Sequence, residues 1–266
     1  MAHNKTQKSK IYKCSNNVIV EKDDDIAIEC PLEIRLGHNN NEFQTLAITL
    51  CTPTDITDLI YGYLFTENII IESKDILEIK IFDNDLGLIA EVLLNHKIAF
   101  EKFLYKRQGM VHTSCGVCGK TEFEDLLTFD YHRLEKPLND IDPSIICSLP
   151  EKLSQKQQGF IKTGGLHACA LFDSQGHILF IKEDIGRHNA LDKLIGCALQ
   201  QQLMPLNNDI ILLSGRISFE LVHKSLIAGL SHLSAIGAPS SLSIEMAQLN
   251  GLRLMGFVKA EGFNTY

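Results

Sequence analysis

The chain has 266 residues, 45% of them hydrophobic and 22% charged, which is ordinary for a globular protein with one large or two modest domains. Its formal net charge of -8 argues against a broad nucleic-acid surface, because phosphate binding depends on Lys and Arg. No apolar run approaches the roughly 20 residues that a bilayer requires, and no apolar segment of a signal peptide follows the polar N-terminus. We therefore expect a cytoplasmic protein that contacts neither nucleic acid nor membrane.

The first half of the chain mixes strand patterns with one helix pattern. The first 25 residues end in the charge run EKDDD and are expected to be frayed. The turn-rich HNNN predicts a hairpin between the two strands that flank it, and Thr54 or Asp55 can cap the helix that follows. Alternating or continuous apolar residues predict strands at 31–36, 43–50, 76–82 and 86–94, and a helix at 54–70.

In the second half, strands alternate with helices, which is typical of an α/β sheet. Strands are expected at 166–172, 177–183, 209–214, 232–237 and 253–259, the last of these ending the fold. Helices are expected at 150–160, 188–200, 218–230 and 240–251. The fold class is therefore α/β, with a smaller N-terminal α+β domain at 1–140 and a second domain at 141–266.

Three junctions in the second half share one pattern, in which a strand ends and a polar or glycine-bearing turn opens a helix. In open α/β sheets, ligands bind outside the carboxyl ends of the strands, and helix N-termini favour anions. Arg187, His188, Asn189 and Arg216 would add donors there, so we expect an anionic, phosphate-bearing ligand. Helix capping alone is the alternative interpretation. The junctions are EDIGRHN (183–189), SGRIS (214–218) and APSS (238–241).

Cys115 and Cys118 form a C-x-x-C motif within KRQGMVHTSCGVCGK (106–120), a segment rich in Gly, Ser and Thr. This composition predicts an exposed, mobile loop, where chemistry tends to be located. The other six cysteines are scattered, several of them in apolar contexts, and are expected to pack in the core. A disulfide framework is not expected in a reducing compartment.

The C-x-x-C motif is compatible with three kinds of chemistry. A zinc site needs four ligands, and although His112 extends the motif to H-x-x-C-x-x-C, the chain has no second cysteine pair of this kind. A redox dithiol usually places its first Cys after a core strand, and GMVHTS is a poor strand. A carrier nucleophile would hold sulfur as a persulfide, and Lys106, Arg107 and His112 would favour its thiolate.

The order of strands and helices in the second half is comparable to that of zinc deaminases, which carry H-x-E and P-C-x-x-C. Those ligands are missing here. His188 opens a helix with no Glu two residues later, SGRISFE contains no cysteine, and His167-Ala168-Cys169 lacks the Glu. Hydrolytic deamination is therefore not expected, and we predict no bound metal.

Several long strings resemble the formate dehydrogenase accessory sulfurtransferase family, FdhD. TSCGVCGK resembles the cysteine loop of that family, and EDIGRHNALDKLIG, LSGRISFELVHK and APSSLSIEMAQLNGLRLMGF resemble its C-terminal part. The resemblance extends over most of the chain, and EDIGRHNALDK is specific where C-x-x-C alone would not be. It implies a C-terminal domain similar to cytidine deaminase, in a three-layer arrangement, and a homodimer.

The resemblance also implies a function. A cysteine desulfurase would load sulfur onto the loop, and the chain would deliver it to molybdenum in a bis(molybdopterin guanine dinucleotide) cofactor for formate dehydrogenase. Cys115 would carry the persulfide with Cys118 as partner or relay, although the spacing does not decide which thiol bears the sulfur. FVKAEG would bind the cofactor through Phe257, Val258, Lys259, Ala260, Glu261 and Gly262. The other interpretation is a cofactor-binding chaperone whose C-x-x-C is structural or a redox dithiol.

Overall fold

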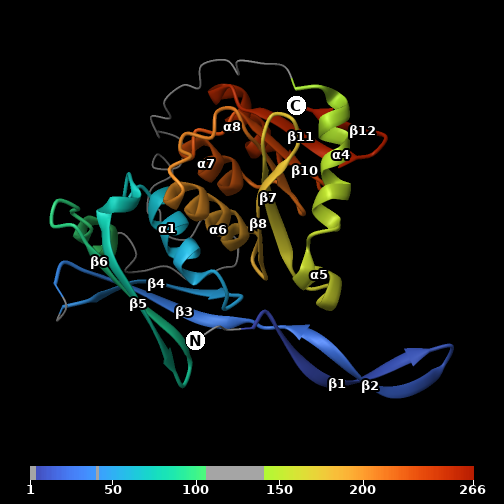
Figure 1. Ribbon diagram of the computed structural model, residues 1–266, viewed down its shortest axis with the longest axis horizontal. Coiled ribbons are helices and arrows are strands. Elements are labelled where there is room, and N and C mark those ends of the chain that lie inside the picture. Colours follow the sequence, from blue (N-terminus) through green and yellow to red (C-terminus); the bar gives the residue numbers. More distant parts are fainter. Residues whose placement is uncertain (1–3, 40–41, 106–140) are drawn as a thin grey trace.

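The computed structural model describes residues 4–39, 42–105 and 141–266 (Figure 1). The described part contains three sheets, with strand orders β1-β2, β4-β3-β6-β5 and β12-β11-β10-β9-β7-β8. The strands are β1 (Thr6–Ser15), β2 (Val18–Ala27), β3 (Cys30–Gly37), β4 (Gln44–Cys51), β5 (Ile76–Asn84), β6 (Gly87–Leu94), β7 (His167–Phe172), β8 (Ile178–Asp184), β9 (Ile210–Leu213), β10 (His232–Ala235), β11 (Arg253–Lys259) and β12 (Gly262–Thr265). The helices are α1 (Ile56–Thr66), α2 (Glu101–Tyr105), α4 (Pro143–Ser154), α5 (Gln158–Thr163), α6 (Arg187–Gln200), α7 (Phe219–Ile227) and α8 (Ser241–Asn250), with a 3₁₀ turn η1 (Ser73–Asp75).

The N-terminal segment forms an antiparallel ribbon, so the expectation that it is frayed is wrong. Strands β1 and β2 pair along ten residues each and project away from the rest of the molecule in Figure 1. Asn16 and Asn17 both have positive φ, which two-residue hairpin turns require and which Asn tolerates. The charged residues that suggested disorder instead face one another across the strands, as in the Lys10–Glu21 ion pair of 2.8 Å.

The four-stranded sheet confirms the four strands and the hairpin expected before residue 100. Leu32, Ile34 and Leu36 alternate along β3 with no exposed surface and face α1, whereas the residues between them are partly exposed. This period of two is what the sequence of a strand covered on one face shows. Helix α1 confirms the expected helix and follows Asp55, although the Asp55 side chain does not cap it.

The six-stranded sheet has helices on both faces, as Figure 1 shows. Ala168, Ala170 and Phe172 of β7 face α4, whose apolar residues are Ile146, Leu149 and Leu153. Cys169 and Leu171, between them in sequence, face the opposite way and share a core with α6. The α/β class and the three-layer arrangement are thus observed, while the likeness to cytidine deaminase stays a prediction.

Two differences from the expected elements occur in the second half. The helix expected at 150–160 is divided into α4 and α5, and β12 follows β11, which was expected to be the last strand. Helix α4 begins seven residues earlier, at Pro143, where Asp142 accepts a hydrogen bond from the Ser144 N–H at 2.8 Å. Helix α5 ends at Thr163 and is followed by Gly164, whose positive φ suits a helix C-terminus. Strand β12 pairs with β11 at the edge of the sheet.

One hydrophobic core joins the two halves of the described chain, because α1 packs directly on α6. The contact is so close that a Cβ on Gly62 would lie 1.8 Å from the Asp192 carbonyl oxygen. The proposed domain boundary at residue 140 stays a prediction, since residues 106–140 lie outside the described part. In the described ranges, no helix is long and apolar enough to cross a membrane.

Candidate functional site

Four strands of the six-stranded sheet end at the same edge. Strands β9, β10 and β11 are parallel, and β8 runs in the same direction because β7 is antiparallel to both β8 and β9. The three junctions singled out in the sequence therefore lie along one edge, together with the β11–β12 turn. We call this region the loop edge and define it by residues 184–189, 214–218, 236–240 and 257–262.

Backbone contacts connect the segments of the loop edge. The Gly237 N–H donates to the Gly215 carbonyl oxygen at 3.1 Å, and the Phe257 N–H donates to the Gly237 carbonyl oxygen at 3.1 Å. Gly237 is required for this close approach, because a Cβ would lie 2.7 Å from the Gly215 oxygen and 2.8 Å from the Arg216 nitrogen. The glycines of SGRIS and of the following loop thus place two turns in direct contact.

Arg187 and His188 begin α6 at this edge. The Nε atom of Arg187 is buried without a hydrogen-bond partner in the described part of the chain. The Nε2 atom of His188 lies 3.2 Å from the Ser218 hydroxyl and 3.2 Å from Glu220 Oε2. Burial, together with Arg187, lowers the pKa of His188 to about 3, so this imidazole is neutral at pH 7. A buried guanidinium nitrogen without a partner is costly unless a ligand completes its contacts.

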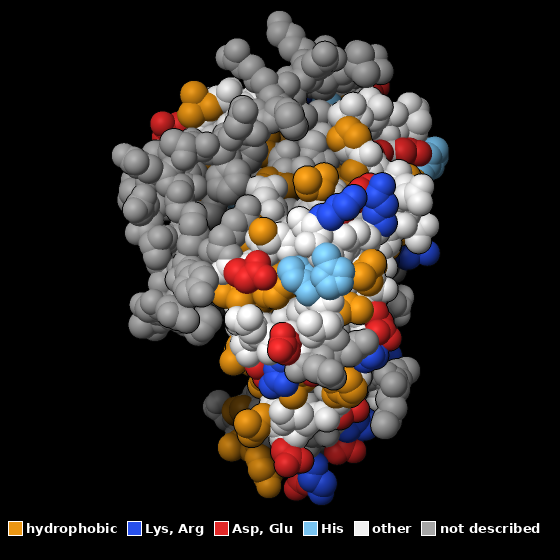
Figure 2. Space-filling view, turned by 90° about the vertical axis from the view of Figure 1, so that its left-hand side faces the viewer, with side chains coloured by type: hydrophobic (Ala, Val, Ile, Leu, Met, Phe, Trp, Pro, Cys, Tyr) orange, Lys and Arg blue, Asp and Glu red, His pale blue; other side chains and the backbone are white. Residues whose placement is uncertain are grey.

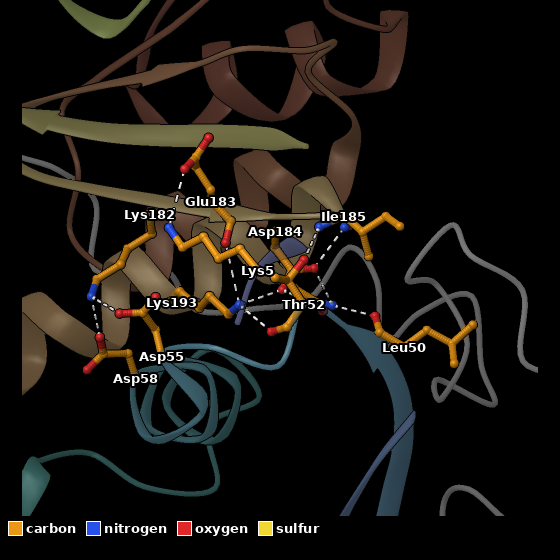
Figure 3. Close-up of polar contacts among 12 residues, drawn as sticks. Lys5, Leu50, Thr52, Asp55, Asp58, Lys182, Glu183, Asp184, Ile185 and Lys193 are labelled. Carbon is orange, nitrogen blue, oxygen red and sulfur yellow. Dashed lines mark hydrogen bonds and ion pairs between the residues drawn. The ribbon is translucent and has the colours of Figure 1, made fainter. Parts of the chain in front are cut away.

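Asp184 connects the two halves of the molecule through Thr52 (Figure 3), and Asn189 does so through Leu50. The Asp184 carboxylate accepts hydrogen bonds from the Thr52 N–H at 2.9 Å and from Lys193 Nζ at 2.6 Å. The Asn189 amide donates to the Leu50 carbonyl oxygen at 2.8 Å and to Asp184 at 3.2 Å, which occupies both of its N–H groups. Only the Asn189 carbonyl oxygen is left for other contacts, so this side chain has no donor for an anion. Its assignment to cofactor binding stays a prediction.

The residues beside Asp184 are also structural. Glu183 is buried and accepts hydrogen bonds from the Gly159 and Phe160 N–H groups at the start of α5, at 2.8 and 2.9 Å. Lys182 pairs with both Asp55 and Asp58 of the α1 region (Figure 3). Much of the specific string EDIGRHNALDK therefore holds elements together, and only Arg187 and His188 in its centre remain for a ligand.

The remaining predicted site residues differ in exposure. Arg216, Lys259, Ala260 and Glu261 are exposed, and Gly262 is half-buried at the start of β12. Val258 is buried in the core, so its side chain cannot reach a ligand. Phe257 has a φ of 54° at a β-bulge, and 48% of its surface is exposed. A bulky residue in this conformation is an outlier of the kind that clusters at functional sites.

Cys115 and Cys118 lie outside the described residues, so their role stays a prediction. Two of the other cysteines, Cys51 and Cys169, are buried, as expected for core packing, whereas Cys14 is exposed. Burial raises the pKa of the Cys51 thiol to about 12, which makes it a poor nucleophile at neutral pH. No group of three or more His, Cys, Asp or Glu within the described ranges could hold a metal ion.

His167 and Glu220 lie beside the loop edge but were not assigned from the sequence. His167 is the first residue of β7, opposite Asp184 in the register with β8. Burial raises the pKa of Glu220 to about 7, next to His188. Because β7 runs antiparallel to β8 and β9, its first residue lies at the edge where those two strands end. The sequence offered a signal for this, since the short turn between the expected strands 166–172 and 177–183 indicates an antiparallel hairpin.

On the face in Figure 2, Lys and Arg lie among Asp, Glu and apolar side chains. The described side chains of that face form no broad cationic surface, in agreement with the net charge of -8. Two exposed cationic side chains, Arg216 and Lys259, lie at the loop edge.

The molecule is therefore a mixed α/β protein whose main sheet carries donors for an anion at its loop edge. A sequence profile of the FdhD/NarQ family matches residues 27–266. A sulfur carrier protein FdhD from Saccharolobus solfataricus is 40% identical over 246 residues, covering 92% of this chain and 90% of the relative. One from Streptomyces avermitilis is 35% identical over 268 residues, covering 98% and 93%. The chain belongs to the FdhD/NarQ family.

A solved structure has the same fold. A chain from Desulfotalea psychrophila, assigned as a formate dehydrogenase accessory protein, matches with a TM-score of 0.74 at 22% identity. The match covers 98% of this chain and 96% of the other.

Proposed function

We propose that this chain is a sulfur carrier with sulfurtransferase activity. It accepts sulfur from a cysteine desulfurase on Cys115 or Cys118 and delivers it to the molybdenum of a bis(molybdopterin guanine dinucleotide) cofactor, which formate dehydrogenase then uses. The observation that carries the proposal is the family match, which spans residues 27–266 and so includes both cysteines. The relatives that cover most of the chain are named sulfur carrier proteins.

The loading step requires only a thiolate and a donor persulfide. The thiolate of Cys115 attacks the terminal sulfur of the desulfurase persulfide, so that a new S–S bond forms and the desulfurase thiolate leaves. No net oxidation occurs. In the release step, the Cys118 thiolate attacks the Cys115 sulfur and expels hydrosulfide, which leaves a Cys115–Cys118 disulfide. The two thiols thereby supply the two electrons that reduce the carried sulfur to sulfide.

The loop edge fits the cofactor as a bound substrate. The nucleotide ends of the cofactor carry diphosphate groups. Arg187 provides a buried Nε atom that has no partner among the described residues, and Arg216 provides an exposed guanidinium on the adjoining loop. The half-exposed ring of Phe257 on the β11–β12 turn is suited to stacking on a nucleotide base. Arg187 and Arg216 would hold the charge and Phe257 the base. A homodimer in the cytoplasm and a cytidine-deaminase-like fold of the second half are parts of the same proposal.

The first test is mass spectrometry after incubation with a cysteine desulfurase and free cysteine. We expect the chain to gain the mass of one sulfur atom, on Cys115 or Cys118, because the composition of residues 106–120 predicts an exposed loop whose thiolate a donor persulfide can reach. Replacing the carrying cysteine with alanine should abolish the adduct. Cys14→Ala is the matched control, since Cys14 is exposed on β1 and lies outside the motif. Wild-type protein without an adduct would favour the chaperone function, and stoichiometric zinc that Cys118→Ala loses would favour a structural clamp.

Cys115→Ala is expected to leave the fold intact. A loop thiol contributes little packing, so the free energy of unfolding should change by no more than about 0.5 kcal/mol, measured by urea denaturation. Cys169→Ser provides the comparison, because Cys169 is buried in β7 and a hydroxyl without a partner there costs about 1–3 kcal/mol. If Cys115→Ala were as destabilising as Cys169→Ser, the loop would have a structural role and the carrier proposal would lose its basis.

A further inference from the structure

His167 lies beside the loop edge, between the start of α6 and the loop that follows β9. In the register of β7 with β8, His167 is opposite Asp184, and Asp184 is three residues before Arg187 in the chain. Its ring lies against Gly215, because a Cβ on that glycine would be 3.4 Å from His167 Nδ1 and 3.5 Å from Cε1. The next residue of β7 is fixed to the same loop by two hydrogen bonds of 2.9 Å between Ala168 and Ser214. The imidazole is therefore held in place while remaining partly exposed.

Among the charged groups around His167, the cation Arg187 has a larger effect than the carboxylate Asp184. From α6 it faces Arg187, and His188 of the same helix is close enough for His167 to lower its pKa. From β8 it faces Asp184, whose carboxylate is already bound by Lys193 at 2.6 Å. Glu220 of α7 lies 3.2 Å from His188 and also interacts electrostatically with Arg187, and Lys224 of α7 acts on His188. Among the described residues, no carboxylate forms an ion pair with Arg187 or His167.

Such an arrangement is unfavourable by itself, because like charges repel and burial penalises each charged form. Burial and Arg187 accordingly lower the pKa of His167, despite the opposing effect of Asp184. An anion bound at this position would instead raise the pKa of His167. It would pair with Arg187, complete the contacts of its buried Nε atom and favour the charged form of the imidazole.

We propose that His167 and Arg187 together hold a diphosphate group of the nucleotide ligand, and that His167 takes up a proton when the ligand binds. The inference rests on the proposed function only in placing a nucleotide at the loop edge, and it adds a residue and a proton to that site. The proton goes from solvent to the imidazole and returns when the ligand leaves. A ligand that gives up its diphosphate contacts therefore also releases a proton.

The direction of the pH effect follows from linkage. Before binding, the pKa of His167 is below its usual value, and in the complex it is higher, so the complex binds more protons than the free protein between these two values. Affinity must then increase as the pH falls through that window. One proton taken up over a full pH unit corresponds to a factor of about ten in affinity.

GDP-mannose is the appropriate probe, because both of its phosphates are esterified and it keeps a constant charge between pH 6 and pH 8. We expect wild-type protein to bind it about tenfold or more tightly at pH 6 than at pH 8 in isothermal calorimetry. Titrations in two buffers of different ionisation enthalpy should show proton uptake. His167→Gln should weaken binding at pH 6 and remove most of the pH dependence. Arg187→Gln should weaken binding at both pH values, and Arg187→Lys should retain part of the affinity.

His177→Gln is the matched control, since His177 lies in the β7–β8 turn at the opposite end of β7 and pairs with Asp173 at 2.9 Å. It should bind like the wild type. Wild-type binding without proton uptake, or a His167→Gln variant with unchanged pH dependence, would overturn the inference and leave the sulfur carrier function intact. If wild-type protein bound no GDP-mannose at either pH, the diphosphate site would be wrong, whereas the sulfur adduct would still test the carrier function separately.

Discussion

Replacing Gly196 with alanine is expected to lower the free energy of unfolding by about 3 kcal/mol or more. A Cβ on Gly196 would lie 1.9 Å from the Asp58 carbonyl oxygen and 2.5 Å from the Gly62 nitrogen. Both are backbone atoms of α1, so no side chain can move aside to relieve the overlap. Helices α1 and α6 would have to separate, and the core they share contains Leu59, Ile60 and Leu194, all buried. Urea denaturation of the purified variant measures the effect.

Gly165→Ala is the control for this experiment. A Cβ at Gly165 would be 3.6 Å from the Ala27 Cβ atom, an ordinary contact, so this variant should stay within about 0.5 kcal/mol of the wild type. Gly62→Ala should reproduce the large loss, because its Cβ would meet the Asp192 carbonyl oxygen. If Gly196→Ala unfolded at the same urea concentration as Gly165→Ala, the two helices could not be packed as closely as described.

The need for glycine at these two positions could not be predicted from the sequence. Both helices were expected from their apolar periodicity, but the periodicity does not say which helices cross or where. Gly62 and Gly196 are 134 positions apart in the chain. By contrast, the strands of the four-stranded sheet were correctly predicted, because residues such as Leu32 and Ile34 alternate along a sheet with one covered face.

The two misinterpreted segments lack that kind of pattern. In the β1–β2 ribbon neither face is covered, so its side chains need not alternate, and Tyr12 and Ile19 remain largely exposed. The local signal was Asn16-Asn17, a pair that suits a tight turn. Strand β12 has only four residues, and Phe263 is the one that packs against a core cluster. Neither segment carries enough buried residues for periodicity to reveal it.

The sequence correctly predicted that the three junctions lie along one edge of the sheet. Strand direction is enough to bring Arg187 and Arg216 to one edge, because parallel strands end together. The roles of individual residues were less accessible. Asn189 is only two residues after Arg187, yet its amide donates to Leu50 and Asp184. These partners follow from the packing of the two halves, which the sequence does not show.

A second buried polar cluster lies behind the loop edge, where α1, α6 and α7 meet. Lys224 Nζ donates to both carboxylate oxygens of Asp192 and to the Thr66 hydroxyl, each at 2.9 Å. The Lys224 and Asp192 side chains are only 3% and 2% exposed. Burial alone would lower the pKa of Lys224, but Asp192 and Glu220 outweigh it and raise that pKa, so the ammonium group stays charged. Each charge is tolerated in the core only because the other is present.

Lys224→Met is therefore expected to lower the free energy of unfolding by about 3–5 kcal/mol at pH 8, because it leaves the Asp192 carboxylate buried without its counter-charge. The loss should be smaller at pH 5.5. Without Lys224 the pKa values of Asp192 and of the neighbouring Glu220 rise further above their unfolded values, so the folded variant binds more protons than the unfolded chain and becomes less stable as the pH increases. Urea denaturation at both pH values, with each free energy of unfolding expressed as a difference from wild type, measures the loss.

Lys10→Met is the control, because it removes an exposed ion pair and should cost about 0–1 kcal/mol at either pH. A loss for Lys224→Met that was equally small would mean that Asp192 is not buried as a charged group, whereas recovery in the Lys224→Met/Asp192→Leu double variant would show that the isolated carboxylate causes the loss.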